Sequence, residues 1–199
     1  MPKTTKHQHF ALHKPYGYLS QFVVNGKQKK RNKLLGELYD FPAGTMAIGR
    51  LDRNSEGLLL LTTDGKVSHD ILSHKYEKEY YVQVDGSITQ EAIQQLKEGV
   101  EISLEGATYK TIPCEAKLME APKRVPIENR TPRDARHGPT SWISITLREG
   151  KYRQVRKMTA AVGFPTLRLI RVRIGAIKLT LTKGAVHPLE LLNDKPHFK

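Results

Sequence analysis

The chain has 199 residues, of which 38% are hydrophobic and 27% charged, and its formal net charge is +13. This composition is typical of a folded globular protein and excludes a disordered chain. The longest apolar runs, such as the four leucines at 58–61, are far shorter than the roughly 20 residues that cross a bilayer. The single cysteine, Cys114, excludes an internal disulfide. Residues 1–14 lack the apolar core of a secretory signal, so we expect a cytoplasmic protein.

The positive charge is concentrated towards the two ends of the sequence. Residues 1–36 contain eight basic residues and no acidic one, and residues 150–199 contain 11 basic and two acidic residues. Residues 37–149 contain 14 basic and 18 acidic residues. Such an excess favours polyanionic partners, either nucleic acid or an anionic membrane. We expect no membrane partner, because no long amphipathic helix with a basic face is predicted.

The predicted elements are mostly strands. In chain order, the apolar pattern predicts strands at 9–13, 45–48, 58–63, 79–84, 111–120, 141–148 and 167–174. Helices are expected near 33–39, 67–73, 89–99 and 153–162. The third of these is the clearest, with Thr89 as its N-cap and Gly99 as its C-terminal stop. Because strands outnumber helices without regular alternation, we expect an α+β fold with a mixed, mostly antiparallel central sheet and flanking helices.

Three segments are expected to lie outside these elements. Residues 1–8 are polar and are predicted to form a flexible N-terminal tail. Residues 24–33 form a basic loop, and residues 121–139, which contain four prolines, form a second long loop within the domain. Residues 9–199 are therefore expected to be a single domain.

The densest chemical signal is the segment GRLDRNSEGLLLLTTDG at residues 49–65. It predicts a polar loop before a buried strand, with one carboxylate, Asp52, between Arg50 and Arg53. The two guanidinium groups would favour the ionised form of the carboxylate, as a nucleophile requires. On spacing alone, the favoured alternative is that Asp52 caps a turn and the arginines are surface cations.

This segment resembles the catalytic motif of the pseudouridine synthases, specifically the ribosomal RNA branch called the RsuA family. The aspartate of that motif is the essential catalytic residue, so the resemblance implies that Asp52 is the nucleophile. Three further segments agree with the family: KPYG at 14–17, KEYYV at 78–82 and EGKYRQVRKM at 149–158. By the same resemblance, Tyr80 packs near the target uridine and Arg156 forms a salt bridge with the catalytic aspartate. The alternative for Tyr80 is an ordinary core aromatic on a strand.

The resemblance also suggests which basic side chains meet RNA. On a helix, Arg153, Arg156 and Lys157 share one face, for which the alternative is a solvated basic surface. Arg50 is a candidate to fill the gap left by a flipped base. The expected RNA-binding residues are Lys14, Arg50, Arg53, Lys151, Arg153, Lys157, Arg168 and Arg171.

The resemblance extends from Phe10 to Ile177 and implies the pseudouridine synthase fold, with two lobes around one RNA-binding cleft. Family members often carry an N-terminal RNA-binding domain of the S4 type. Only nine residues precede Phe10, so we expect that domain to be absent. This narrows the resemblance to the compact RluE-type branch, which acts on 23S rRNA.

The function implied by this resemblance is the isomerisation of a specific uridine to pseudouridine in ribosomal RNA, most closely 23S rRNA. A uridine in folded RNA must be flipped out before a carboxylate can reach it. The reaction needs no metal or cofactor, and the sequence has no Walker, dinucleotide-binding or zinc-protease motif. We expect a monomer. The main alternative is a non-catalytic RNA-binding or ribosome-assembly protein, which explains the charge equally well.

Overall fold

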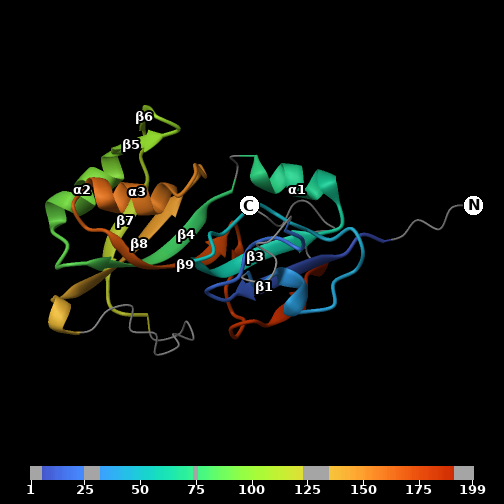
Figure 1. Ribbon diagram of the computed structural model, residues 1–199. Helices are drawn as coiled ribbons and strands as arrows, with labels where there is room; N and C mark the ends of the chain where they lie inside the picture. The colour runs from blue at the N-terminus through green and yellow to red at the C-terminus, as the bar shows by residue number, and fades with distance from the viewer. Residues whose placement is uncertain (1–5, 25–31, 74–75, 123–134, 191–199) are drawn as a thin grey trace, which may run out of the picture. The chain divides into compact units, whose positions relative to one another are not determined.

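The computed structural model describes residues 6–24, 32–73, 76–122 and 135–190 (Figure 1). Most of the predicted loops at 24–33 and 121–139 therefore lies outside the described residues. The chain folds as two compact units. The first, called here the outer unit, is Met1–Tyr76 together with Gly175–Lys199. The second, the inserted unit, is the continuous stretch Glu77–Ile174.

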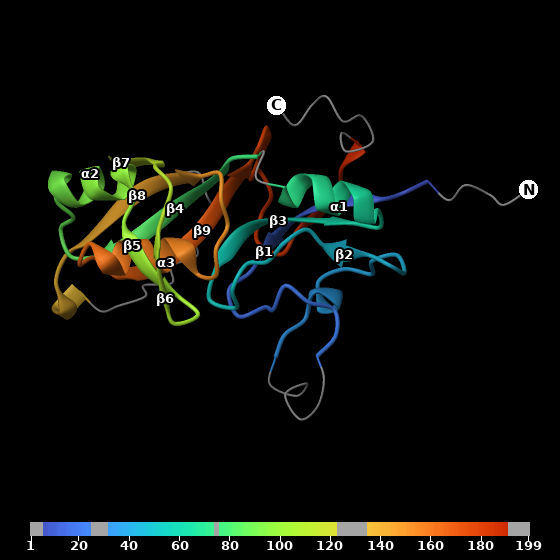
Figure 2. The same cartoon turned by 90° about the horizontal axis from the view of Figure 1, so that it is seen from above.

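The outer unit is built around a completely buried strand. Its elements are β1 (His9–Lys14), a 3-10 turn (Leu35–Glu37), β2 (Met46–Ala47), β3 (Glu56–Thr62), α1 (Gly65–Leu72), β10 (Ile177–Lys178) and β11 (Val186–Pro188). Strand β1 pairs antiparallel with both β3 and β11, and β2 pairs antiparallel with β3. Helix α1 packs along β3 (Figure 1, Figure 2). Because every residue of β3 is buried, its four consecutive leucines supply core on both faces.

The inserted unit is a four-stranded antiparallel sheet with two helices and a hairpin. Its elements are β4 (Lys78–Asp85), α2 (Gln90–Glu98), β5 (Glu101–Leu104), β6 (Ala107–Lys110), β7 (Glu115–Met119), a 3-10 turn (Ala135–His137), β8 (Thr140–Leu147), α3 (Gln154–Ala161) and β9 (Thr166–Ile174). The strand order is β9-β4-β8-β7, and β5 pairs with β6. Helices α2 and α3 lie over the same face of the sheet (Figure 1).

The side chains of β4 alternate between the two faces of this sheet. Tyr80, Val82 and Val84 are buried, whereas the alternate residues Glu79 and Tyr81 are only half-buried. The buried residues belong to the face that the helices cover, because successive side chains of a strand point to opposite sides. Tyr81 therefore points away from the face of Tyr80.

The expected α+β fold is confirmed, with antiparallel strand pairs and an isolated parallel bridge between Tyr18 and Lys33. The hairpin of β5 and β6 was not predicted. Its turn, Glu105-Gly106, has φ values of +51° and +85°. Asn-Gly or Asp-Gly is the usual signal for such a turn, and Ile102 alone is buried in the two strands, so the pattern was weak.

The ends of α2 agree with the sequence. The Thr89 hydroxyl accepts a hydrogen bond from the amide of Ala92 at 3.2 Å, which makes Thr89 the N-cap. Gly99 ends the helix with a φ of +91°, in the left-handed region that favours glycine. A Cβ at this position would also collide with the carbonyl oxygen of Thr111. Gly99 is thus required by both its backbone angle and its neighbour.

The predicted flexible tail is wrong at its last two residues. The amide of Gln8 donates to the hydroxyl of Thr63 at 2.9 Å, and the carbonyl of Gln8 accepts from the amide of Thr63 at 3.0 Å. His7 Nδ1 lies 3.3 Å from the same hydroxyl. These bonds continue the pairing of β1 with β3. Local sequence could not reveal them, because Thr63 is more than 50 residues away.

Candidate active site

Asp52 lies in the connection between β2 and β3 of the outer unit. On its N-terminal side, the hydroxyl of Ser20 donates to the carbonyl of Leu51 at 2.8 Å and accepts from the amide of Leu51 at 3.0 Å. On its C-terminal side, the amide of Ser55 donates to the carbonyl of Asp52 at 2.9 Å. Leu51 and Ser55 are buried, whereas Asp52 is only half-buried. The connection therefore presents a carboxylate from a backbone that is anchored on both sides.

The KPYG turn at residues 14–17 is joined to this connection. The amide of Gly17 donates to the carbonyl of Arg53 at 2.8 Å, and Arg53 Nε lies 3.4 Å from the carbonyl of Gly17. Two segments that the sequence separates by more than 30 residues thus form one backbone assembly around Asp52. Arg50 and Arg53 are both exposed on it.

The EGKYRQVRKM segment at 149–158 forms a turn and the start of α3. Arg153 is the N-cap residue and has left-handed backbone angles of φ 52° and ψ 31°, with an exposed side chain. Val155 and Met158 are buried, which confirms the apolar stripe expected on this helix. Lys157 is half-buried, and its ammonium donates to the carbonyl of Ser103 at 2.6 Å. The helix is therefore tied to β5 and does not present a fully solvated basic face.

Tyr80 lies on the covered face of the inserted unit and is 9% exposed. Its neighbours in the sheet are Ile145 on β8 and Arg171 on β9. This environment places the ring among core residues, with a small exposed part.

A family model described as RNA pseudouridylate synthase matches residues 8–161 of the chain. The chain belongs to this family. The matched range contains the three residues expected to be catalytic, Asp52, Tyr80 and Arg156.

Several relatives of this pseudouridine synthase bear names that specify the large ribosomal subunit. The ribosomal large subunit pseudouridine synthase E of Xanthomonas axonopodis pv. citri is 41% identical over 170 residues, which cover 84% of this chain and 86% of that protein. The protein of the same name from Vibrio parahaemolyticus is 41% identical over 174 residues, covering 84% and 67%. The ribosomal large subunit pseudouridine synthase B of Yersinia pestis is 37% identical over 150 residues, covering 73% and 41%.

Solved structures support the same fold. A crystal structure of a pseudouridylate synthase superposes with a TM-score of 0.75 at 27% sequence identity, covering 98% of this chain and 74% of that one. The human RNA Pseudouridylate Synthase Domain Containing 1 gives a TM-score of 0.54 at 14% identity, covering 92% and 78%. The second likeness concerns the fold alone.

Lys14 of this pseudouridine synthase is not a surface residue, and the predicted RNA contact is wrong. Its side chain is 0% exposed. The ammonium donates to the carbonyl of Pro15 at 2.9 Å and to the carbonyl of Tyr18 at 2.8 Å. A buried charge of this kind organises backbone. Lys14 therefore supports the KPYG turn, which in turn contacts the Asp52 connection at Arg53.

Arg168 and Arg171 require a similar correction. Both lie on β9 and are 2% and 4% exposed. A guanidinium with so little accessible surface is not available to a phosphate, so neither side chain is an exposed RNA contact. The remaining predicted contacts stay predictions: Lys157 is half-buried, and the exposed ones are Arg50, Arg53, Lys151 and Arg153.

Glu149 is a structural element of the motif that the sequence did not single out. Its carboxylate accepts hydrogen bonds from Tyr109 Oη at 2.6 Å, the amide of Ile112 at 3.1 Å and the side chain of Gln154. Gln154 also accepts from the amide of Lys151 at 2.9 Å. The bond to the carboxylate raises the pKa of the Tyr109 hydroxyl. Glu149 thus holds the β5–β6 hairpin and the turn before α3 together.

We expect Glu149→Gln to lower the free energy of unfolding by about 2 kcal/mol, because an amide nitrogen cannot replace a buried carboxylate oxygen as acceptor. Urea denaturation measures the loss. Hydrogen exchange should accelerate at the amides of Ile112 and Lys151. Glu105→Gln, which changes an exposed carboxylate of the same unit, is the control and should leave both measurements unchanged. Equal stability of the two variants would contradict the role of Glu149.

The described residues contain no group of three or more His, Cys, Asp or Glu side chains arranged to hold a metal ion. In the same residues, no helix is both long and apolar enough to cross a membrane.

Proposed function

We propose that this protein isomerises a specific uridine to pseudouridine in 23S rRNA of the large ribosomal subunit. The observation that carries the proposal is the likeness to the Xanthomonas protein named for that subunit, at 41% identity across 84% of this chain. The backbone assembly around Asp52 supports it, because a partly exposed carboxylate on an anchored loop suits attack on a bound nucleotide.

The reaction breaks the N1–C1′ bond of uridine, turns the uracil and joins C5 to C1′. We propose Asp52 as the group that begins it. In one route a carboxylate oxygen bonds to C1′ as N1 leaves with the electron pair, and C5 of the turned uracil then displaces the carboxylate. In the other, the carboxylate removes the C2′ proton as N1 leaves with the electron pair, which gives a glycal; C5 of the turned uracil then bonds to C1′ as the carboxylate returns the proton to C2′. In both routes the C5 proton is lost at the end and N1 gains one, so atoms and charge balance.

The other predicted roles remain proposals that rest on the motifs. Tyr80 is proposed to contact the flipped base, and Arg156 to hold the catalytic carboxylate ionised and oriented. Arg50, Arg53, Lys151, Arg153 and Lys157 are proposed RNA contacts. We further propose a single cytoplasmic catalytic domain over residues 9–199 that acts as a monomer and needs no membrane.

The proposal is tested by tritium release from 23S rRNA transcribed with 5-tritiated uridine. Isomerisation replaces the C5 proton, so the enzyme should release tritium into water, whereas RNA binding alone releases none. Release at the background level from 23S rRNA would overturn the proposal. Release from 16S rRNA or bulk tRNA instead would move the substrate to another RNA.

A further inference from the structure

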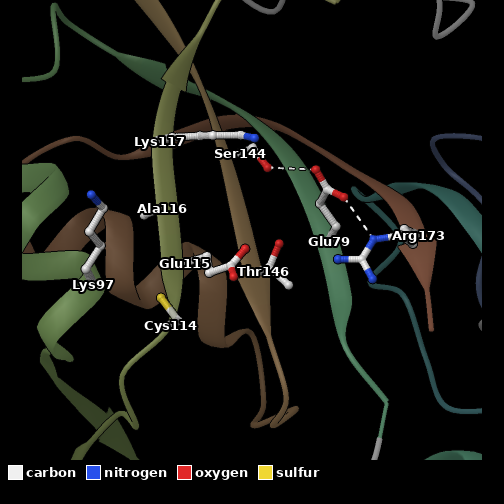
Figure 3. Close-up of a pocket in the computed structure, with 9 residues that line it drawn as sticks. All are labelled: Glu79, Lys97, Cys114, Glu115, Ala116, Lys117, Ser144, Thr146 and Arg173. Carbon is white, nitrogen blue, oxygen red and sulfur yellow. Dashed lines mark hydrogen bonds and ion pairs between the residues drawn. The ribbon is translucent and has the colours of Figure 1, made fainter. Parts of the chain in front are cut away.

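The inserted unit contains a pocket of about 540 Å³ (Figure 3). Its lining comes from the strands β4, β7, β8 and β9, from Cys114 just before β7 and from the end of α2. All of these belong to the inserted unit. Such a volume lies within the roughly 300–1,000 Å³ that small-ligand sites occupy.

The pocket opens on the face of the sheet away from Tyr80. Glu79, which lines the pocket, precedes Tyr80 on β4, so the two side chains point to opposite faces. Thr146, another lining residue, is the direct neighbour of Glu79 on β8. The pocket therefore lies mainly on the face opposite to Tyr80, and it reaches Lys97 of α2 beside β7, the last strand of the order (Figure 3).

One wall of the pocket is neutral and fixed. The hydroxyl of Ser144 donates to Glu79 Oε1 at 2.9 Å, and Arg173 Nε donates to Glu79 Oε2 at 3.0 Å (Figure 3). Arg173 also bonds Glu77 at 3.2 Å, and Glu77 is paired in turn with Arg148 at 3.1 Å, so two guanidinium groups balance the two carboxylates. Because both oxygens of Glu79 are engaged and its charge is balanced, this wall does not repel an anion.

The remaining charged lining is exposed and available to a ligand. Lys97 at the end of α2, and Lys117 and Glu115 on β7, are all exposed. Within the described residues, neither ammonium forms an ion pair with a carboxylate. Cys114 also lines the pocket, but burial raises the pKa of its thiol to about 11, so it is a neutral and unreactive group.

We infer that this pocket binds an unpaired nucleotide of the substrate RNA, with its base at Glu115 and its two flanking phosphates at Lys97 and Lys117, whose ammonium groups lie on opposite sides of β7 (Figure 3). The inference rests on the proposed function. A phosphate alone would not favour a carboxylate beside the two ammonium groups. A base with an exocyclic amino group, as in adenine, cytosine or guanine, donates to a carboxylate, and unpaired RNA bases are read in this way.

The test measures binding of an unmodified 23S rRNA transcript by filter retention over a range of salt concentrations. Lys97→Gln and Lys117→Gln should each weaken binding roughly 3- to 10-fold at low salt and lower the salt slope, by about 1 in the double variant. Glu115→Ala should also weaken binding, by about 5-fold, because the base loses its acceptor. Lys110→Gln and Glu101→Ala, exposed residues that face each other on the hairpin, are matched controls and should bind within about 2-fold of wild type.

The sign of the Glu115→Ala effect separates base recognition from simple charge. Removing a negative charge near RNA tightens non-specific binding, so a gain in affinity would overturn the inference. Wild-type affinity in all three pocket variants would overturn it as well. Micromolar binding of a free mononucleotide, with RNA affinity unchanged by the variants, would also reject RNA as the occupant. Tritium release by the wild type, assayed in parallel, tests the proposed function separately. Failure of the pocket inference can therefore be distinguished from failure of the proposed function.

Discussion

Asp52→Asn is expected to lower pseudouridine formation by at least about 10⁴-fold, to the background of the assay. An amide neither attacks C1′ nor accepts a proton as a carboxylate does. The fold should be kept, because the connection is anchored through the backbone of Leu51 and Ser55 and not through the carboxylate. Tritium release measures activity, and circular dichroism with filter retention measures fold and RNA binding.

The matched control is Asp40→Asn, which makes the same change at an exposed position of the outer unit. It should retain wild-type activity. Full activity in Asp52→Asn would show that another residue begins the reaction. Lost activity together with lost structure or lost RNA binding would show that Asp52 supports the loop instead of the chemistry.

Lys14→Met is expected to lower the free energy of unfolding by about 3 kcal/mol. Methionine fills a similar volume but donates no hydrogen bond, so the carbonyls of Pro15 and Tyr18 lose a charged donor inside the protein. For a chain of this size the melting temperature should fall by about 6–12 °C. Urea denaturation and thermal melting measure the two quantities.

The same variant decides between support of the fold and contact with RNA. If Lys14 supports the turn, RNA affinity of the folded protein should equal that of Lys66→Met, a variant of an exposed lysine in α1. A variant that keeps wild-type stability but binds RNA about 10-fold less tightly would restore Lys14 as a phosphate contact.

The sequence predicted the elements and the chemical motif better than it predicted the long-range contacts that hold them in place. The run around Asp52 identified the loop and the buried strand after it, because both are encoded by neighbouring residues. The contacts that hold this loop come from Ser20 and Gly17, more than 30 residues earlier. No local pattern specifies such a contact, since it depends on which strands pair.

Charge was the least reliable guide to position. Lys14, Arg168 and Arg171 are predicted to contact RNA because they lie in the two basic end segments of a chain that resembles an RNA-modifying family. All three are nearly inaccessible in the structure. On β9 the residues from Arg168 to Val172 are buried without alternation, so a two-residue period could not show that the arginines face inward. A high net charge therefore predicts a partner without identifying the residues that meet it.

The two partner strands of β1 are synthesised at very different times. Ala11 on this strand pairs with Leu60 on one side and with His187 on the other. The ribosome therefore releases all of Glu77–Ile174 before β11 exists, and the edge of β1 stays open throughout. An open edge is prone to mispairing while a nascent chain folds. A nascent chain can thus carry the complete catalytic motif while still lacking β11, the strand that pairs with the open edge of β1.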